Sequence, residues 1–466
     1  MPVIGWRGNA LRFFINPIAF MTRIFETHGN VVRLARGGNS SALFFKSRGP
    51  HPGTFFAFGP ECNRRILTDA DLFESRAPAG PATEAFRQLA TNFFFINGER
   101  HQDLRRLMMP AFARERLKVY HHVIVDATRR MLDRWAGRER VDLAEELGLA
   151  ALEISSRCFY GLDPRLEDQN LAVKMLEMIN TLFSPAVLLP LDLPGMPYHR
   201  LVRNMEEIIE ALGREIENKR RGGCAGDDVL SLMVREHDRD PAVLSRDELV
   251  GNAFVMFFAG HDTTAKALTW TLFLLATHPR VAAELVEELE TRLGGEAPSY
   301  EEVFELPLLD RVVKESLRLL SPAVMFARQT TRETELGGFE IPRGAEIIYS
   351  PYVTHLDASI FAEPKKFLPD RWLSLRPTPY QYLPFGGGVR TCLGAAFGGA
   401  QLRTMVALAL QRYRLEIVPG SRIDLRVNVV MAPRGQVPVR LYPQDRAIGE
   451  GGRSLEGFVS EMIDFP

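Results

Sequence analysis

The chain has 466 residues, 46% hydrophobic and 25% charged, a composition typical of a soluble globular enzyme with a sizeable core. Lysine plus arginine total 57 against 58 for aspartate plus glutamate, so the net charge gives no reason to expect a nucleic-acid partner. The four cysteines lie far apart, without a C-x-x-C pair, which argues against a zinc site and a disulfide scaffold and favours a cytoplasmic location.

The first apolar stretch runs from Leu11 to Phe25. It is broken by Asn16-Pro17 and carries Arg12 and Arg23, so it is unsuited to crossing a bilayer. We therefore expect no transmembrane anchor and predict that this segment packs on the body of the protein.

The rest of the chain alternates between short strand-like stretches and a long helical region. Helical patterns fill most of residues 100–320, and the Pro-rich segment 182–199 is too broken for one helix, which indicates a lid. Strand-like residues are expected in an early antiparallel sheet and again near the end, at 31–34, 43–45, 54–57, 346–350 and after 412. The predicted fold class is mainly α with small antiparallel β-sheets, as one domain over residues 1–445 with a polar, frayed tail at 446–466.

A long apolar helix is predicted from residue 246, after the capping box that Ser245 forms with Glu248, to a stop at Pro279. Its centre reads AGHDTT, Ala259 to Thr264, with an acid and two hydroxyls in mid-helix. Glycine costs about 1 kcal/mol relative to alanine at such a position. This unfavourable sequence calls for a functional reason.

Further along, Pro307 opens a helix in which Glu315 and Arg318 share a face. A pair at this spacing is usually solvated, but the apolar surroundings predict burial here. Removing Glu315 would then leave a guanidinium uncompensated.

The most informative segment is FGGGVRTCLG, Phe385 to Gly394, which runs into a long apolar-faced helix. A cysteine at a helix start lies in the field of unpaired amides, which favours the thiolate. The glycines permit a tight backbone turn and close approach of a flat cofactor, Gly394 permits close packing after Cys392, and Phe385 can shield the sulfur.

This segment matches the haem-binding motif F-x-x-G-x-R-x-C-x-G of the cytochrome P-450 family without departure. Three other motifs resemble that family in the same order. They are the acid-alcohol motif at Ala259 to Thr264, the E-x-x-R pair at Glu315 and Arg318, and the segment FLPDRW, whose Arg371 completes a Glu-Arg-Arg network. The resemblance covers most of the chain from about residue 100 to 438.

The resemblance implies a haem b cofactor (iron protoporphyrin IX) with Cys392 as the metal ligand. It also implies that Thr263 is the alcohol beside bound dioxygen, that Asp262 relays protons, and that the helix bulges over the haem at this point. The other residues implied to contact the cofactor include four propionate partners; the full set is His101, Arg105, Ala259, Gly260, Arg328, Phe385, Arg390 and Gly394.

The resemblance further implies an oxidoreductase that inserts one atom of O2 into a lipophilic small molecule, by hydroxylation or epoxidation. With no flavin or nicotinamide segment in the chain, electrons are expected from a ferredoxin or flavodoxin and an NAD(P)H-dependent reductase. A cluster of cations after His101 predicts either a positive docking patch or a solvated helix face: Arg105, Arg106, Arg114, Arg116 and Lys118.

Several alternatives remain at this level. A haem-thiolate peroxygenase would tend to lose the acid-alcohol pair, and a haem-based sensor would need an output module. His261 is either a packing histidine or a further acid/base group. Terpenoid, steroid, fatty acid and polyketide substrates all suit the apolar residues expected at the pocket, which are Phe93 to Phe95, Phe254, Phe257, Phe258, Met325, Phe326, Val430 and Met431.

Overall fold

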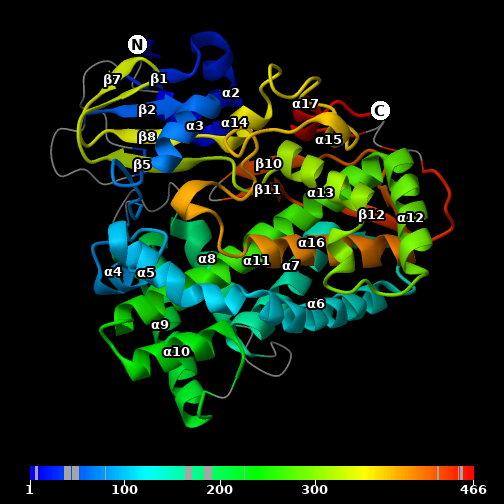
Figure 1. Ribbon diagram of the computed structural model, residues 1–466, viewed down its shortest axis with the longest axis horizontal. Helices are drawn as coiled ribbons and strands as arrows, with labels where there is room; N and C mark the ends of the chain where they lie inside the picture. Colours follow the sequence, from blue (N-terminus) through cyan, green and yellow to red (C-terminus); the bar gives the residue numbers. More distant parts are fainter. Residues whose placement is uncertain are drawn as a thin grey trace.

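The computed structural model describes the chain except for residues 6–8, 36–42, 45–51, 79, 163–169, 183–190, 225, 428–429, 450 and 452–454. Helices make up most of it, with the strands gathered in small sheets (Figure 1). Within the described residues, no helix is long and apolar enough to cross a membrane.

A five-stranded sheet lies at one end of the molecule, in the order β1-β2-β8-β5-β3 (Figure 1). The strands are β1 (Val31–Arg33), β2 (Thr54–Ala57), β3 (Phe73–Glu74), β5 (Phe326–Thr330) and β8 (Glu346–Tyr349). β2 and β8 run parallel and the other pairs antiparallel, so the sheet is mixed rather than purely antiparallel. Every residue of β2 and β8 is buried, including the polar Thr54 and Glu346 that begin them, and the Thr54 hydroxyl donates to the Glu346 carboxylate at 2.6 Å.

The N-terminal apolar stretch forms two helices, α1 (Asn9–Ile15) and α2 (Pro17–His28). The Asn16 side chain caps α2 by accepting the Ala19 N–H at 3.1 Å, and Pro17 occupies the first turn. Phe13 and Met21 are buried against the sheet, as the sequence predicts.

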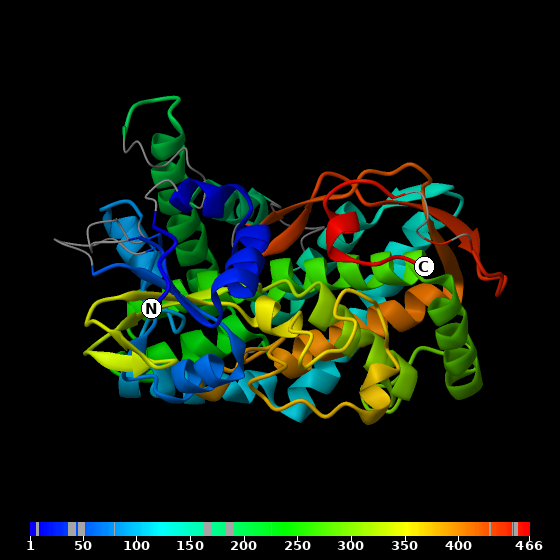
Figure 2. The same cartoon turned by 90° about the horizontal axis from the view of Figure 1, so that it is seen from above.

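The helical part is built around α11 (Arg246–Thr277), which contacts α4, α7, α9, α13 and α16. The view turned by 90° shows α11 crossing the molecule beneath the N-terminal segments (Figure 2). The predicted capping box between Ser245 and Glu248 is present, and the helix ends just before Pro279, which begins α12. The other helices are α3 (Gly59–Thr68), α4 (Glu84–Ala90), α5 (Gly98–Met108), α6 (Arg114–Trp135), α7 (Leu143–Ser155), α8 (Asn170–Leu182), α9 (Pro197–Arg221), α10 (Val229–Arg239), α12 (Pro279–Leu293), α13 (Pro307–Leu319), α14 (Pro351–His355), α15 (Arg371–Ser374), α16 (Ala395–Arg412) and α17 (Val459–Met462).

Three smaller sheets complete the described fold, in the orders β4-β12-β9, β10-β11 and β6-β7, and all their pairs are antiparallel. Their strands are β4 (Arg140–Asp142), β6 (Thr334–Leu336), β7 (Phe339–Ile341), β9 (Tyr413–Ile417), β10 (Asp424–Val427), β11 (Met431–Arg434) and β12 (Pro438–Pro443). The predicted strands at 346–350 and after 412 are therefore confirmed as β8 and β9.

Two local expectations are wrong. Leu43 and Phe44 form a bend rather than a strand. The end of the chain is not frayed, because α17 packs its Val459 and Met462 into the core, with Ile463 beside them. Apolar residues spaced through a Gly-rich, polar segment gave too weak a periodic signal to predict this docking. Residues 183–190 of the predicted lid lie outside the described residues; residue 182 ends α8 and Pro197 begins α9, so the segment is not one helix, as expected.

Candidate active site

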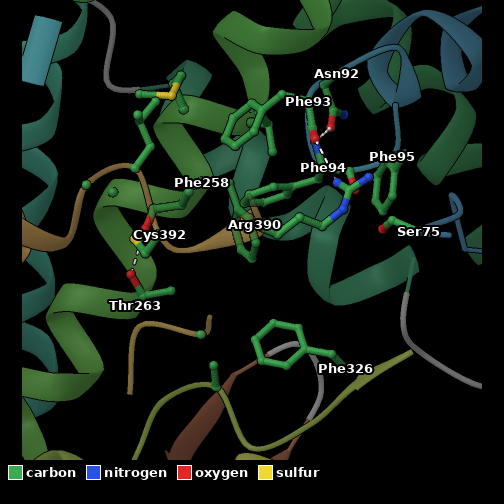
Figure 3. Close-up of a pocket in the computed structure, with 18 of the residues that line it drawn as sticks. Ser75, Asn92, Phe93, Phe94, Phe95, Phe258, Thr263, Phe326, Arg390 and Cys392 are labelled. Atoms are coloured by element: carbon green, nitrogen blue, oxygen red, sulfur yellow. Dashed lines mark hydrogen bonds between the residues drawn. The ribbon is translucent and has the colours of Figure 1, made fainter. Parts of the chain in front are cut away.

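A cavity of about 480 Å³ lies between α11, β5, the segment 92–95 and the loop that leads to α16. Cys392 and Thr263 both line it, and Phe258 and Phe326 contribute to its walls (Figure 3). The sequence motifs that lie about 130 residues apart therefore meet at one site.

The loop before Cys392 makes a tight turn that only glycine permits at two positions. Gly386 and Gly388 have φ of +70° and +64°. A Cβ on Gly388 would lie 2.1 Å from the Leu67 carbonyl oxygen, so this residue has no room for a side chain. Gly387, by contrast, is extended, with φ of −162°, so the expectation of a special conformation holds for two of the three glycines. The turn is closed by the Cys392 N–H, which donates to the Phe385 carbonyl at 2.8 Å.

The Cys392 thiol faces the cavity, which explains why it is accessible although it lies deep within the protein. Burial raises its pKa, and the Gly394 N–H and the Arg105 guanidinium lower it by a smaller amount. The backbone amide at the helix start favours the thiolate, as expected, but desolvation outweighs it. A bound metal cation would supply the missing driving force, since a coordinating thiol loses its proton.

Gly394 contacts Cys392 through its backbone rather than through close packing against the described chain. A Cβ there would lie 3.8 Å from the nearest ring atom of Phe112, an ordinary contact, so close packing against the described chain does not require glycine. What the residue provides is its backbone N–H, which points at the Cys392 sulfur.

The four predicted propionate partners all line the cavity: His101, Arg105, Arg328 and Arg390. Arg390 is fixed by Asn97 Oδ1 at 2.6 Å and by three backbone carbonyls of residues 93–96. Burial and the nearby Arg328 lower the pKa of Arg390 to about 10. Burial and the three arginines lower the pKa of His101 to about 4. No described residue lining the cavity is an aspartate or glutamate, so this concentration of positive charge has no protein carboxylate to balance it there.

The AGHDTT segment crosses the cavity on α11. Thr263 lines the cavity and donates its hydroxyl to the Ala259 carbonyl at 2.6 Å. Asp262 does not line it; its carboxylate lies 3.5 Å from the ammonium of Lys266, one turn along the helix. α11 is continuous through this segment, so the bulge that the resemblance implies is not seen at residues 259–264.

His261 points away from the cavity toward α7. Its Nε2 lies 3.3 Å from the Gly148 carbonyl, and its ring stacks on Phe257 with centroids 5.8 Å apart. Its Nδ1 has no hydrogen-bond partner among the described residues, and burial lowers its pKa. These contacts favour the packing interpretation over an acid/base role at the cavity.

The cavity walls are mostly apolar, and the sequence identified only some of the residues that line them. Phe93 to Phe95, Phe254, Phe258, Met325 and Phe326 line the cavity as expected, whereas Phe257, Val430 and Met431 belong to the core. Further apolar residues line the cavity without any motif that could have identified them, among them Phe44, Phe86, Phe159, Met178, Ile179, Leu182 and Met205.

The predicted positive patch is largely neutralised. Arg106, Arg114 and Arg116 each pair with an acidic side chain, and Lys118 shares Glu301 with Arg114. Arg105 lines the cavity rather than the surface. The solvated-face interpretation therefore fits better.

The residues present fit a haem. An accessible sulfur faces the cavity, a glycine turn leaves its backbone uncovered, and a cluster of cations without a carboxylate suits two propionates. Within the described part of the chain, no cluster of three or more His, Cys, Asp or Glu offers a different metal site. The arrangement would suit a haem whose iron is held by a single thiolate.

Comparison with known proteins agrees with this site. The chain belongs to the cytochrome P450 family, whose model, described as "Cytochrome P450", matches residues 7–438. It is 30% identical over 450 residues to "Cyclooctatin synthase" of Streptomyces melanosporofaciens, with 94% of each chain covered. It is 28% identical over 430 residues to "Cyclooctat-9-en-7-ol 5-monooxygenase" of the same organism, covering 89% of each. It is also 28% identical over 449 residues to "Pentalenene oxygenase" of Streptomyces avermitilis, covering 93% of this chain and 94% of that protein.

Solved structures share the fold. "Retinoic acid bound cyanobacterial CYP120A1" superposes with a TM-score of 0.81 at 23% identity, covering 95% of this chain and 99% of that one. "Crystal structure of cytochrome P450DA heme domain" gives the same TM-score at 22% identity, covering 96% and 98%. The predicted family and fold class are confirmed. The protein is a cytochrome P450 monooxygenase, which implies haem iron, O2, a redox partner and a hydrophobic substrate.

Proposed function

We propose that Cys392 is the axial ligand of a haem b and that His101, Arg105, Arg328 and Arg390 hold its propionates. The observation that carries this assignment is the cluster of these four residues in the cavity that Cys392 faces. When bound, the haem supplies the activation of dioxygen, and thiolate donation favours cleavage of the O–O bond.

We propose that Thr263 and Asp262 deliver protons in this reaction. The Thr263 hydroxyl reaches the cavity and donates a hydrogen bond to the Ala259 carbonyl. It can turn to donate to an oxygen in the cavity when a stronger hydrogen-bond acceptor is bound there. Asp262 lies one residue away and is one-sixth exposed, so its carboxylate is placed to exchange protons with solvent after it leaves Lys266.

We propose a terpenoid substrate, oxidised by hydroxylation or epoxidation. Relatives named for cyclooctat-9-en-7-ol and pentalenene, both apolar ring compounds, align over most of their length. The walls support the same class, since phenylalanine and methionine side chains offer broad apolar contacts. The cation that lines the cavity outside the propionate cluster, Arg76, lies 3.6 Å from Glu74 and is half exposed, a weak anchor for a fatty-acid carboxylate.

A spectral titration of the purified haem protein tests the substrate class. Cyclic terpene hydrocarbons and alcohols should displace the water from the iron and shift the Soret band at low concentration. Fatty acids of the same carbon number serve as the comparison and should bind more weakly. Tighter binding of the fatty acids would exclude the proposed class.

We propose that a ferredoxin or flavodoxin with an NAD(P)H-dependent reductase supplies the electrons in the cytoplasm. Because the cations near α6 are paired, docking should depend little on them. Reversing Arg114 and Arg116 to Glu should leave the reduction rate at low salt within about twofold of the original. A large decrease would restore the positive patch as the docking site.

A further inference from the structure

A π-helical turn follows α7 at Ser156–Tyr160 and presses two consecutive aromatic residues against α11. Phe159 and Tyr160 are 2% and 3% exposed. A π turn adds a residue to the helix locally, and such turns are frequent at functional sites. The widened turn changes the direction in which these two side chains leave the helix.

Phe159 occupies the space where Gly260 of α11 would carry a side chain. A Cβ on Gly260 would lie 2.1 Å from Phe159 Cε2 and 2.8 Å from its Cζ. The ring cannot withdraw easily, because it is packed against Phe397 of α16 and Phe112, with centroids 5.1 and 6.1 Å away. The unfavourable glycine in mid-helix therefore has a packing cause in this chain.

Tyr160 holds the same helix at a second point. Its hydroxyl donates to the Ala253 carbonyl at 2.7 Å, and its ring lies 5.8 Å from that of Phe257. Ala253 and Gly260 are seven residues apart, which is about 10 Å along the helix axis. The contacts at Gly260 and Ala253, two turns apart, fix both the axial position and the rotation of α11 at the cavity.

We propose that Phe159 is a positioning residue for Thr263. The Thr263 hydroxyl donates to the Ala259 carbonyl, which is joined directly to the Gly260 nitrogen. The packing contact between the Phe159 ring and Gly260 therefore determines the position of this carbonyl and this hydroxyl in the cavity. The inference rests on the proposed role of Thr263 in proton delivery and adds the residue that holds it in place.

The test is a rescue experiment with the haem-loaded enzyme. Gly260→Ala should lower the midpoint of thermal unfolding by several degrees, because the new methyl group overlaps the ring. Phe159→Leu deletes the overlapping Cε2 and Cζ atoms, so the double variant should regain most of that loss. A Gly260→Ala variant as stable as the parent, or a double variant without recovery, would overturn the proposed contact.

Gly251→Ala provides the matched control on the same helix. Its Cβ would lie 2.3 Å from the Thr91 carbonyl oxygen, so it should be destabilising as well. Phe159→Leu should not rescue it. Equal rescue of both alanine variants would mean that Phe159→Leu stabilises the protein generally, which would contradict a specific seat on Gly260.

Product formed per NAD(P)H consumed measures the positioning role itself. Phe159→Leu should keep the red-shifted carbon monoxide band but lower this ratio by about twofold or more, with hydrogen peroxide as the balance. Because Phe159 also lines the cavity, two substrates of different size are compared, and a positioning role lowers the ratio for both. An unchanged ratio, or a loss confined to one substrate, would overturn the proposal. A Thr263→Ala variant is measured in parallel. If Thr263→Ala lowers the ratio and Phe159→Leu does not, only the positioning role fails; if neither lowers it, the proposed role of Thr263 fails as well.

Discussion

Glu315 and Arg318 form a two-point ion pair, at 3.0 and 2.9 Å, in which both side chains are completely buried. Arg371 and the Trp372 indole N–H each donate to the same carboxylate at 2.9 Å. The predicted Glu-Arg-Arg network is thus present, and Trp372, the last residue of the FLPDRW segment, is a fourth member whose contact was not predicted. Two arginines and the Trp372 N–H share the single negative charge of Glu315. The Glu315 carboxylate therefore controls the stability of the whole cluster.

Glu315→Gln should therefore be severely destabilising. The amide keeps the shape of the side chain but leaves Arg318 buried without a counter-charge, at a cost of about 3–5 kcal/mol. Urea unfolding of the purified protein and its haem content measure the effect. Glu61→Gln is the control, since Glu61 and Arg64 form a pair at the same spacing with side chains 82% and 56% exposed. That loss should stay below about 1 kcal/mol; equal losses for both variants would contradict the buried network.

Cys392→Ser should abolish the red-shifted Soret band of the ferrous carbon monoxide complex. The shift requires a thiolate ligand, and the described part of the chain offers no other cysteine facing the cavity. Cys158→Ser is the control because Cys158 is buried at the π-helical turn, and this variant should keep the band. A parent protein whose band lies at the histidine-ligated position would refute the assignment of Cys392.

Lowering the pH should decrease the free energy of unfolding through protonation of His355 in the unfolded chain. This residue is fully buried and accepts the Leu383 N–H on Nε2 at 2.8 Å, two residues before Phe385. Burial and the nearby Arg318 lower its pKa to about 3 from an ordinary 6.5. Between these pH values the unfolded chain binds a proton that the folded one does not. The free energy of unfolding therefore falls as the pH is lowered from 6.5 toward 3, by up to about 1.4 kcal/mol per pH unit for this group.

Urea unfolding at several pH values from 7 to 4 checks this dependence. His355→Gln retains an oxygen acceptor for Leu383 and should flatten the profile. His28→Gln changes an exposed histidine and should not. Two parallel profiles for the His355 and His28 variants would show that other groups control the acid response.

The motifs predicted which polar residues share the cavity much better than they predicted its walls. Cys392, Thr263 and the four predicted propionate partners were named from the motifs, and the structure brings them together in one cavity. Phe159 was not named, because a phenylalanine that fits a hollow in another helix has no spacing rule in the sequence. The docked end of the chain was missed for the same reason, and the net rise in the pKa of Cys392 could not be predicted because the depth of burial is a tertiary property.

Thr263 is the most direct test of catalysis, because its proposed role concerns a proton rather than binding or folding. Thr263→Ala removes the hydroxyl that donates to Ala259 but keeps a good helix former, so the protein should fold and bind haem and substrate. It should still consume NAD(P)H, yet form less product and more hydrogen peroxide, since protons no longer reach the reacting oxygen in order. Asp262→Asn should instead slow turnover as a whole, because the residue that exchanges protons with solvent is lost.

Thr271→Ala provides the matched control for Thr263→Ala. Thr271 lies on the same helix and donates to the carbonyl one turn earlier, that of Ala267 at 2.8 Å, but it does not line the cavity. The same substitution there removes the same type of hydrogen bond, so any loss of stability common to both variants belongs to that bond. A loss of product per NAD(P)H should be confined to Thr263→Ala, because the Thr263 hydroxyl reaches the cavity and the Thr271 hydroxyl does not. If Thr263→Ala kept the parent ratio with a true substrate, the proton-delivery role would be withdrawn, while the assignment of Cys392, which rests on the carbon monoxide spectrum, would stand.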